Sequence, residues 1–342
     1  MPRISDYPIV TLPADADVFL VVQGGVTKKV AFSQIKSALI DNATVLGAEE
    51  CTITDGIDSV IVGGYDNHIA VNQGSTVHSS VIAGGEENAL TDVDYAAILG
   101  GLTNAINGAQ TSSILSGQDN TITGDVDDAP TVYGTVIAGG EGNAIADSDR
   151  SSILGGLSNQ IVGSKDAGGY PYGKGATING GVENLITITC VAAHNNVGRE
   201  AIGGGGNNAI TLTYAADYDG YATIGGGYNN SITASFGTIP GGLENTVSGE
   251  CGYAAGRRSH ATAAGAFAMS DSTDADFTNA VENSFAARFA GGYNFTGGRV
   301  KVPSIQVADD AADATLSGTP KIFTLYDSEG TPYYVKGYPT KA

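Results

Sequence analysis

The sequence predicts an all-β fold, a parallel β-roll or β-solenoid. One observation is a repeated unit of a small residue, two aliphatic residues, Gly-Gly, two variable residues, Asn, one variable residue and an aliphatic residue, as in SVIAGGEENAL at 80–90. A second is that Gly accounts for 50 of 342 residues, about twice the usual share. A third is that apolar residues lack the i, i+3, i+4, i+7 spacing of a helix, and Gly-Gly in each unit would break one. Two short strands around a glycine turn fit each unit better.

Aligning the units on their asparagine sets the number of coils. The asparagine column contains Asn67, Asn88, Asn104, Asn120, Asn143, Asn159, Asn184, Asn208, Asn230 and Asn245. Cys51 opens the series and His260 closes it, so 10 + 2 = 12 coils are expected, with a base period of 16 residues. A buried amide must be hydrogen-bonded. We therefore predict that the asparagines form a structural ladder, each amide donating to the next coil; ligand contact is the alternative.

Three further columns follow from the same alignment. Six residues before the asparagine stands an almost purely β-branched column, and two residues after it a second aliphatic column, such as Ile82 and Leu90. Stacking of parallel coils would bury both columns. Between them a glycine column, with Ala48 and Arg257 as exceptions at its ends, predicts a tight turn in every coil.

Longer coils carry their extra residues at one point, after the second aliphatic residue, as at 123–134, 162–175, 187–199 and 211–221. Insertions at one point of a repeat emerge on one side of the stack. Loops on a rigid scaffold are where binding usually occurs. These insertions contain Tyr133, Tyr170, Tyr172, Tyr214, Tyr218 and Tyr221, so they are one candidate receptor-binding region.

The two ends lack the repeat, which divides the chain into 1–41, a repeat shaft at 42–299, and 300–342. Residues 18–22 and 26–30 flank Gly24-Gly25, which predicts a hairpin, and Ser33 would cap a short helix over 34–39. In the last segment two strands, 321–326 and 333–338, flank a turn. A cap on the open end of the solenoid is the first interpretation. A receptor-binding tip is the alternative, with possible contacts from Tyr326, Tyr333, Tyr334 and Tyr338.

Composition excludes several partners and chemistries. With 16 Lys+Arg against 36 Asp+Glu, the net charge of −20 disfavours nucleic acid. The sequence contains no run of about 18 apolar residues, so we predict no membrane-spanning helix. Cys51, Cys190 and Cys251 form no CxxC pair, so we expect buried free thiols and neither disulfides nor zinc. The four histidines lack metal-site spacing, and no nucleophile or phosphate-binding motif occurs. We expect no cofactor, no metal and no catalysis.

Three segments carry a resemblance to known proteins. The string VFLVVQGGVTKKV at 18–30 resembles the N-terminal virion-attachment segment of bacteriophage tail fibres and tailspikes. The Ala-rich AAGAFAM at 263–269 resembles the head repeats of trimeric autotransporter adhesins, and NSFAARFAGGYNF at 283–295 is similar to the segment that closes such rolls in phage fibres. The 16-residue unit is longer than the usual adhesin repeat, and no membrane anchor or long stalk follows. The resemblance therefore favours a phage protein over a bacterial autotransporter.

The resemblance implies a homotrimeric tail fibre or receptor-binding protein in the virion tail, made in the host cytoplasm, with intertwined or side-by-side rolls. Its partners would be its own copies, phage tail, baseplate or adaptor proteins through the N-terminal segment, and a host surface glycan or protein receptor. One alternative is a tailspike that depolymerises glycans, with Glu86 and Glu87, or Asp217 and Asp219, as the carboxylate pair. Another is a cellular trimeric adhesin.

Overall fold

The computed structural model describes residues 44–46, 48–71, 77–124, 132–165, 171–172, 175–190, 199–214 and 220–293, and the strands of one hairpin near each end. It divides into two units, Met1–Gly291 and Gly292–Ala342. The hairpin predicted across Gly24-Gly25 is confirmed, because β1 (Val18–Gln23) pairs antiparallel with β2 (Val26–Ala31). In the second unit β39 (Ile322–Tyr326) pairs antiparallel with β40 (Pro332–Lys336), also as predicted. The helix expected at 34–39 lies outside the described residues.

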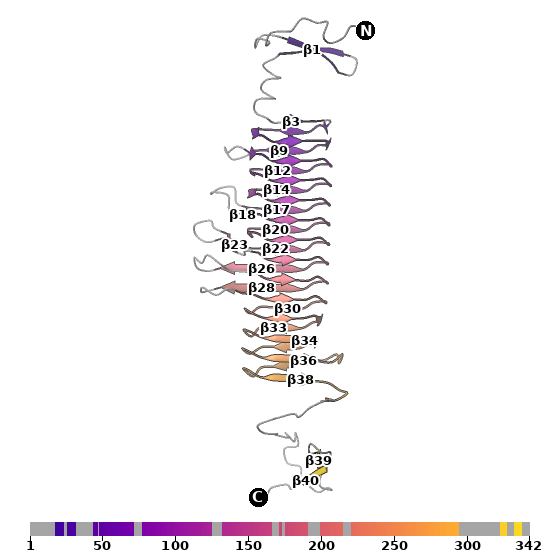
Figure 1. Cartoon of the computed structure of the whole chain (residues 1–342), viewed down its shortest axis with the longest axis vertical. Helices are drawn as coiled ribbons and strands as arrows, with labels where there is room; N and C mark the ends of the chain where they lie inside the picture. Colours follow the sequence, from indigo (N-terminus) through magenta and orange to yellow (C-terminus); the bar gives the residue numbers. More distant parts are fainter. Residues whose placement is uncertain are drawn as a thin grey trace. The chain divides into compact units, whose positions relative to one another are not determined.

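The described part of the shaft is an all-β solenoid without helices, in which parallel strands stack in about 11 turns (Figure 1). A 15-stranded sheet forms one wall and a 13-stranded sheet the other. The first wall contains β3 (Thr44–Val45), β7 (Val60–Ile61), β11 (Val81–Ile82), β13 (Ala97–Ile98), β16 (Ser113–Ile114), β19 (Val136–Ile137), β21 (Ser152–Ile153), β25 (Thr177–Ile178), β27 (Ala201–Ile202), β29 (Thr223–Ile224), β31 (Thr238–Ile239), β34 (Tyr253–Arg257), β36 (Phe267–Ser270), β38 (Phe285–Arg288) and, beside β34, β32 (Gly242–Leu243).

The second wall contains β5 (Thr52–Ile53), β9 (His68–Ala70), β12 (Ala89–Thr91), β14 (Ala105–Asn107), β17 (Thr121–Thr123), β20 (Ala144–Ala146), β22 (Gln160–Val162), β26 (Leu185–Cys190), β28 (Ala209–Tyr214), β30 (Ser231–Ile232), β33 (Thr246–Val247), β35 (Ser259–Ala261) and β37 (Phe277–Asn279). Four short pairs lie outside the walls: β4 (Ala48–Glu49) with β8 (Gly64–Tyr65), β6 (Gly56–Ile57) with β10 (Val77–His78), β15 (Ala109–Gln110) with β18 (Val132–Tyr133), and β23 (Ser164–Lys165) with β24 (Pro171–Tyr172).

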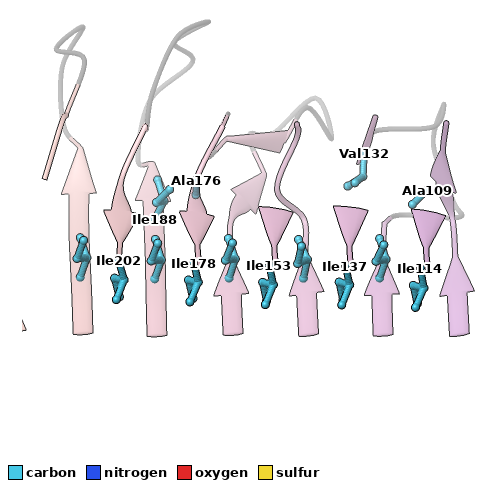
Figure 2. Close-up of a cluster of buried hydrophobic side chains, with 14 of the residues drawn as sticks. Ala109, Ile114, Val132, Ile137, Ile153, Ala176, Ile178, Ile188 and Ile202 are labelled. Carbon is cyan, nitrogen blue, oxygen red and sulfur yellow. The ribbon is translucent and has the colours of Figure 1, made fainter. Parts of the chain in front are cut away.

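The core consists of the two aliphatic columns that the sequence predicts. Residue pairs such as Ile82↔Ile98 in the first wall and Leu90↔Ile106 in the second are in register, and all four side chains are fully buried. Figure 2 shows one row of these side chains, with Ile114, Ile137, Ile153, Ile178 and Ile202 in successive coils. Each coil is too thin to enclose a core, so the neighbouring coils complete it.

The glycine column forms the turn between the walls. From Gly64 to Gly242 its glycines have φ between +84° and +119°, a region that costs energy for residues with a Cβ. Space also requires glycine: a Cβ on Gly140 would overlap the carbonyl oxygen of Gly156 and lie 2.5 Å from Asn143 Nδ2. The tight-turn prediction is therefore confirmed.

The closing coil differs from the predicted alignment by one residue. Ser259, not His260, occupies the asparagine position, because Thr246 pairs with His260 and the Ser259 N–H donates to Asn245 Oδ1 at 3.0 Å. The glycine column likewise ends at Gly256, which pairs with Gly242, and not at Arg257. Ala261 is buried where the exposed Thr262 was expected. The preceding coil has two residues between its buried wall residue and its turn glycine, Ile239 and Gly242, whereas this coil has one, between Ala254 and Gly256. Each later position is therefore occupied by the residue one earlier in the sequence than the alignment predicted.

Two columns of non-glycine residues adopt left-handed backbone conformations. The residue before each ladder position has φ between +51° and +57° at Glu50, Asp66, Glu87, Thr103, Asp119, Ser158, Glu183, Asn207, Asn229, Glu244 and Arg258. In each coil this conformation directs the backbone N–H to the preceding coil, as in Glu87 N to Tyr65 O at 3.0 Å. The second column, nine residues before the ladder position, includes Tyr95, Arg150 and Phe236. It lies on the side of the insertions.

Candidate functional site

The ten asparagines form a ladder in the interior, beside the glycine turn. All ten side chains are fully buried. In a typical step Asn143 donates from its backbone N–H and from Nδ2 to Asn120 Oδ1, both at 3.0 Å. Nδ2 also lies 3.0 Å from the carbonyl oxygens of Gly139 and Gly156. Because neighbouring coils satisfy both ends of the amide, the ladder is structural and presents no polar group to a ligand.

The cysteines differ from the buried thiols that we expected. Cys51 is only half-buried, at the open start of the ladder, where its Sγ accepts the Asn67 N–H at 3.3 Å in place of an asparagine oxygen. Cys251 is exposed, because it lies in the second left-handed column, whose side chains point outward. The side chain of Cys190 lies outside the described residues.

The strands β26 and β28 are longer than their neighbours in the second wall and extend to one side of the stack (Figure 1). β26 and β28 pair over six residues, from Leu185↔Ala209 to Cys190↔Tyr214. Ile188 and Leu212 are buried in this extension and enlarge the core beneath the insertions. The roots of the insertions are therefore rigid parts of the wall and can hold exposed side chains in fixed positions.

We define the insertion edge as the outward side chains of Tyr95, Tyr133, Arg150, Arg199, Tyr221 and Phe236. Tyr95 is 62% exposed, Tyr133 41% and Tyr221 39%. Tyr133 and Tyr221 belong to the tyrosines that the sequence nominated. The side chains of Tyr170, Tyr172, Tyr214 and Tyr218 lie outside the described residues.

Arg199, Tyr221 and Phe236 form a continuous stack on this edge. They occupy the same position in three successive coils, since Ala201 pairs with Thr223 and Thr223 with Thr238. The Arg199 guanidinium lies 5.7 Å from the centroid of the Tyr221 ring, and its Nη1 donates to Tyr221 Oη at 3.0 Å. The rings of Tyr221 and Phe236 stack with centroids 6.2 Å apart and planes inclined by 27°.

Arg150 and Arg199 are the only arginines between residues 37 and 256 of the sequence, and both lie on this edge. Between residues 37 and 256 the sequence contains only four Lys or Arg, namely Arg150, Lys165, Lys174 and Arg199. Arg150 and Arg199 share one column, and both are exposed. Lys165 and Lys174 belong to the insertion at 162–175. In a chain of net charge −20, the two exposed arginines place positive charge at two positions of this column.

The acidic neighbours of the two arginines in sequence, Asp149 and Glu200, are buried. Asp149, next to Arg150, is 5% exposed, and its Oδ1 accepts the Tyr133 N–H at 2.6 Å. Glu200, next to Arg199, is fully buried in a column otherwise occupied by small residues such as Ala176 and Ala222. The two carboxylates therefore lie beneath the surface while the two guanidinium groups remain on it.

A second charged cluster closes the C-terminal coils. Arg257 and Arg258 both pair with Asp274 Oδ1, at 2.8 and 3.2 Å, and Arg258 Nε also lies 2.8 Å from Asp276 Oδ1. Hydrogen bonds from His260 and Arg258 lower the pKa of Asp276. Arg288 donates to the carbonyl oxygens of 273, 275 and 276. These contacts tie the 271–276 loop to the coils and indicate a structural clasp.

Asp271 anchors the other end of the clasp. Its Oδ2 accepts the Ala290 N–H at 2.6 Å and its Oδ1 accepts the Thr273 N–H at 3.0 Å. The hydrogen bond from Ala290, followed by those from Thr273, lowers the pKa of Asp271 to about 2. The carboxylate is therefore ionised over the whole ordinary pH range.

The remaining nominated residues gather into no catalytic arrangement in the described chain. Glu86 and Glu87 are exposed at adjacent positions of the turn, and Glu86 pairs with Tyr65 and Leu102 of the neighbouring coils. Asp217 and Asp219 lie outside the described residues. Tyr326, Tyr333 and Tyr334 fall on the C-terminal hairpin, but their side chains, and all of Tyr338, are likewise outside. Across the described stretches no group of three His, Cys, Asp or Glu could hold a metal ion. They also contain no helix able to span a membrane.

Fold and edge together define the class: a parallel β-solenoid with an internal asparagine ladder and insertions displayed along one edge. Neither the known protein families nor the curated proteins provide a match to this chain. The function must therefore be argued from the geometry and from the sequence patterns themselves.

Proposed function

We propose that the protein is a bacteriophage tail fibre or receptor-binding protein, a virion component that attaches the particle to the host cell surface. The observation that carries the proposal is the insertion edge: exposed aromatic and basic side chains held at fixed positions on a rigid stack. A repetitive scaffold with variable loops on one edge is suited to binding a surface. The N-terminal segment, which resembles virion-attachment segments, would hold the other partner, a tail, baseplate or adaptor protein.

A homotrimer is part of the proposal, and the outer face of the first wall supports association. The outward positions on both sides of the buried isoleucines carry no charged residue from Thr44 to Ala287. Leu46, Val62, Leu99, Leu115 and Leu154 are 53, 47, 51, 41 and 54% exposed in one column. Fourteen strands about 4.8 Å apart make this face about 60 Å long. A face that is uncharged over that length, and that presents exposed Leu and Val side chains between Leu46 and Leu154, is suited to a second copy in an acidic chain.

Binding without catalysis is the activity that we propose. A depolymerising tailspike would need two carboxylates facing one glycosidic bond. Glu86 and Glu87, the described pair, are solvent-exposed neighbours on a turn, and neither lies in the insertion edge. A cellular adhesin would use the same edge on another host surface.

The decisive experiment measures adsorption of purified protein to host cells. Variants lacking the 162–175 insertion or residues 303–342 are compared with the parent after each is shown to have the parent's oligomeric state. Loss of adsorption in either variant supports receptor binding and identifies the region. If both variants adsorb as well as the parent, the receptor is bound by another part of the insertion edge; if the parent itself does not adsorb, the proposal of a receptor-binding protein fails. Release of reducing sugar from host polysaccharide would instead favour the depolymerase alternative.

A further inference from the structure

We propose that the insertion edge around Arg199, Tyr221 and Phe236 binds an acidic polysaccharide, with Arg199 pairing to its carboxylates. This inference rests on the proposed receptor-binding function and names the class of receptor. Its basis is the coincidence, in one column, of Arg150 and Arg199, the only arginines between residues 37 and 256, with the stacked rings of Tyr221 and Phe236.

The charge distribution points to an anionic ligand. In a chain of net charge −20, the exposed guanidinium groups of Arg150 and Arg199 supply local positive charge for an anion. Arg199 uses one N–H for Tyr221 Oη. The guanidinium carries five N–H donors in a planar fork that matches a carboxylate. The contact with Tyr221 orients this fork, and thereby reduces the side-chain freedom that binding would remove.

The aromatic stack adds the second recognition element. Tyr221 and Phe236 continue the line that Arg199 begins, one ring per coil, with an inclination of only 27°. The faces of such rings provide apolar contact area while the Tyr hydroxyl supplies a polar contact. A saccharide unit offers apolar C–H faces together with hydroxyl and carboxylate groups. A linear acidic glycan bound along the stack would contact the Arg199 guanidinium in one coil and the rings of Tyr221 and Phe236 in the next two.

In the column that contains Arg150 and Arg199, each arginine follows a glycine of the preceding coil. Gly134 and Gly175 precede Arg150 and Arg199 by one coil each, and a Cβ there would lie 3.9 and 3.7 Å from the arginine Cγ atoms. The arginine side chains therefore extend over bare backbone. Two coils separate Arg150 from Arg199, about 10 Å at the strand spacing, so a polymer with repeated carboxylates could contact both.

The test uses the full-length protein with polygalacturonate oligosaccharides, polysialic acid, dextran sulfate and neutral dextran, by isothermal titration calorimetry. We expect binding to a carboxylated probe, weakening as salt is raised, and no binding to dextran. Arg199→Gln should lower the affinity at least tenfold and Arg199→Lys less. Tyr221→Leu should also weaken binding. The matched controls are Arg258→Gln, a cation in the clasp, and Tyr228→Leu, an exposed tyrosine on the turn outside the insertion edge; neither should change the affinity.

Several outcomes would overturn the inference. They are unchanged affinity of Arg199→Gln, preference for dextran, preference for sulfate over both carboxylated probes, or no binding to any acidic probe. Host-cell adsorption separates this failure from that of the proposed function. If the parent and Arg199→Gln adsorb to cells equally, receptor binding stands and the acidic-glycan site is wrong. If the parent does not adsorb at all, the proposed function itself fails.

Discussion

Asn143 and Asn120 lie one coil apart, and a single oxygen of Asn120 accepts two hydrogen bonds from Asn143, one from the backbone and one from the side chain. The amide therefore sets the register of the backbone as well as its own position. The same pair of bonds recurs at each step from Asn67 to Asn245. Loss of one amide should affect two interfaces between coils.

Asn143→Ala should destabilise the stack by about 1–3 kcal/mol, the cost of one orphaned buried donor, because the Asn159 N–H loses its acceptor while Asn159 Nδ2 keeps the carbonyl oxygens of Gly155 and Gly181. Thermal unfolding followed by circular dichroism measures the effect. Gln118→Ala, which removes an exposed amide from the same turn region, is the control and should change little. Equal melting of the two variants would contradict a structural ladder.

Gly85→Ala should lower the melting temperature strongly while Gly84→Ala should leave it nearly unchanged. A Cβ on Gly85, at φ +94°, would overlap the Gly101 carbonyl oxygen and lie 2.5 Å from Asn88 Nδ2, whereas a Cβ on Gly84 meets nothing within 4 Å. Adjacent positions in one turn thus provide their own control. If both variants melt like the parent, the second glycine does not form the close contact between coils.

Glu87→Val should be destabilising by a fraction of the ~1–2 kcal/mol that the left-handed conformation costs any residue with a Cβ, because Glu87 has φ +54° and a β-branched residue adopts this region less readily than unbranched glutamate. Glu87→Gly should be neutral or stabilising, because glycine adopts this region without strain. Denaturant unfolding of both variants gives the comparison. Glu86→Val, one residue earlier, should leave the free energy of unfolding nearly unchanged. An equal loss of stability in both variants would show that the lost charge, and not backbone strain, causes the effect.

The clasp should loosen in strong acid. The pKa of Asp271 in the folded protein is about 2, below its ordinary value of 3.8, so its contribution is fully present above about pH 4. It is lost as the pH falls through about 2. Hydrogen-exchange protection of the Ala290 N–H, corrected for intrinsic exchange, should fall over this range. In Asp271→Asn this pH dependence should disappear, and its persistence would assign the effect to another group.

Leu99→Glu and Leu115→Glu together should prevent association. Both side chains are about half exposed on the uncharged face, so the coil can accept the substitutions while a contact between copies cannot. Sedimentation should give about three times 34.5 kDa for the parent and a smaller species for the variant. Glu87→Lys, at the turn, serves as a control of changed charge. A folded, monodisperse monomer of the parent would contradict the trimer.

The sequence predicted the wall positions of the shaft well, because one repeating pattern fixes the turn, the ladder and the core together. Asn67 to Asn245 and the isoleucine column could be aligned from the repeated motif alone, although the spacing between units varies. The closing coil could not, since Ser259 and His260 are both polar and only the strand register distinguishes them. The left-handed column before each asparagine had a signal in its many Asp, Glu and Asn residues, but backbone angles do not follow from composition.

The Arg199 stack was missed although its signal was present. Arg199 and Tyr221 are 22 residues apart in sequence, and insertions of different length separate them, so tyrosines were grouped by insertion instead of by column. Counting nine residues back from Asn208, Asn230 and Asn245 gives Arg199, Tyr221 and Phe236. The parallel register converts that constant offset into contact.

Register and loop length are independent in this solenoid. The ladder steps keep hydrogen bonds of about 3 Å whether the chain between two asparagines spans 15 residues, as before Asn245, or 25, as before Asn184. A coil can therefore gain, lose or exchange its insertion while its neighbours remain unchanged. Selection on such a molecule could alter what the edge recognises one loop at a time, without placing the stability of the stack at risk.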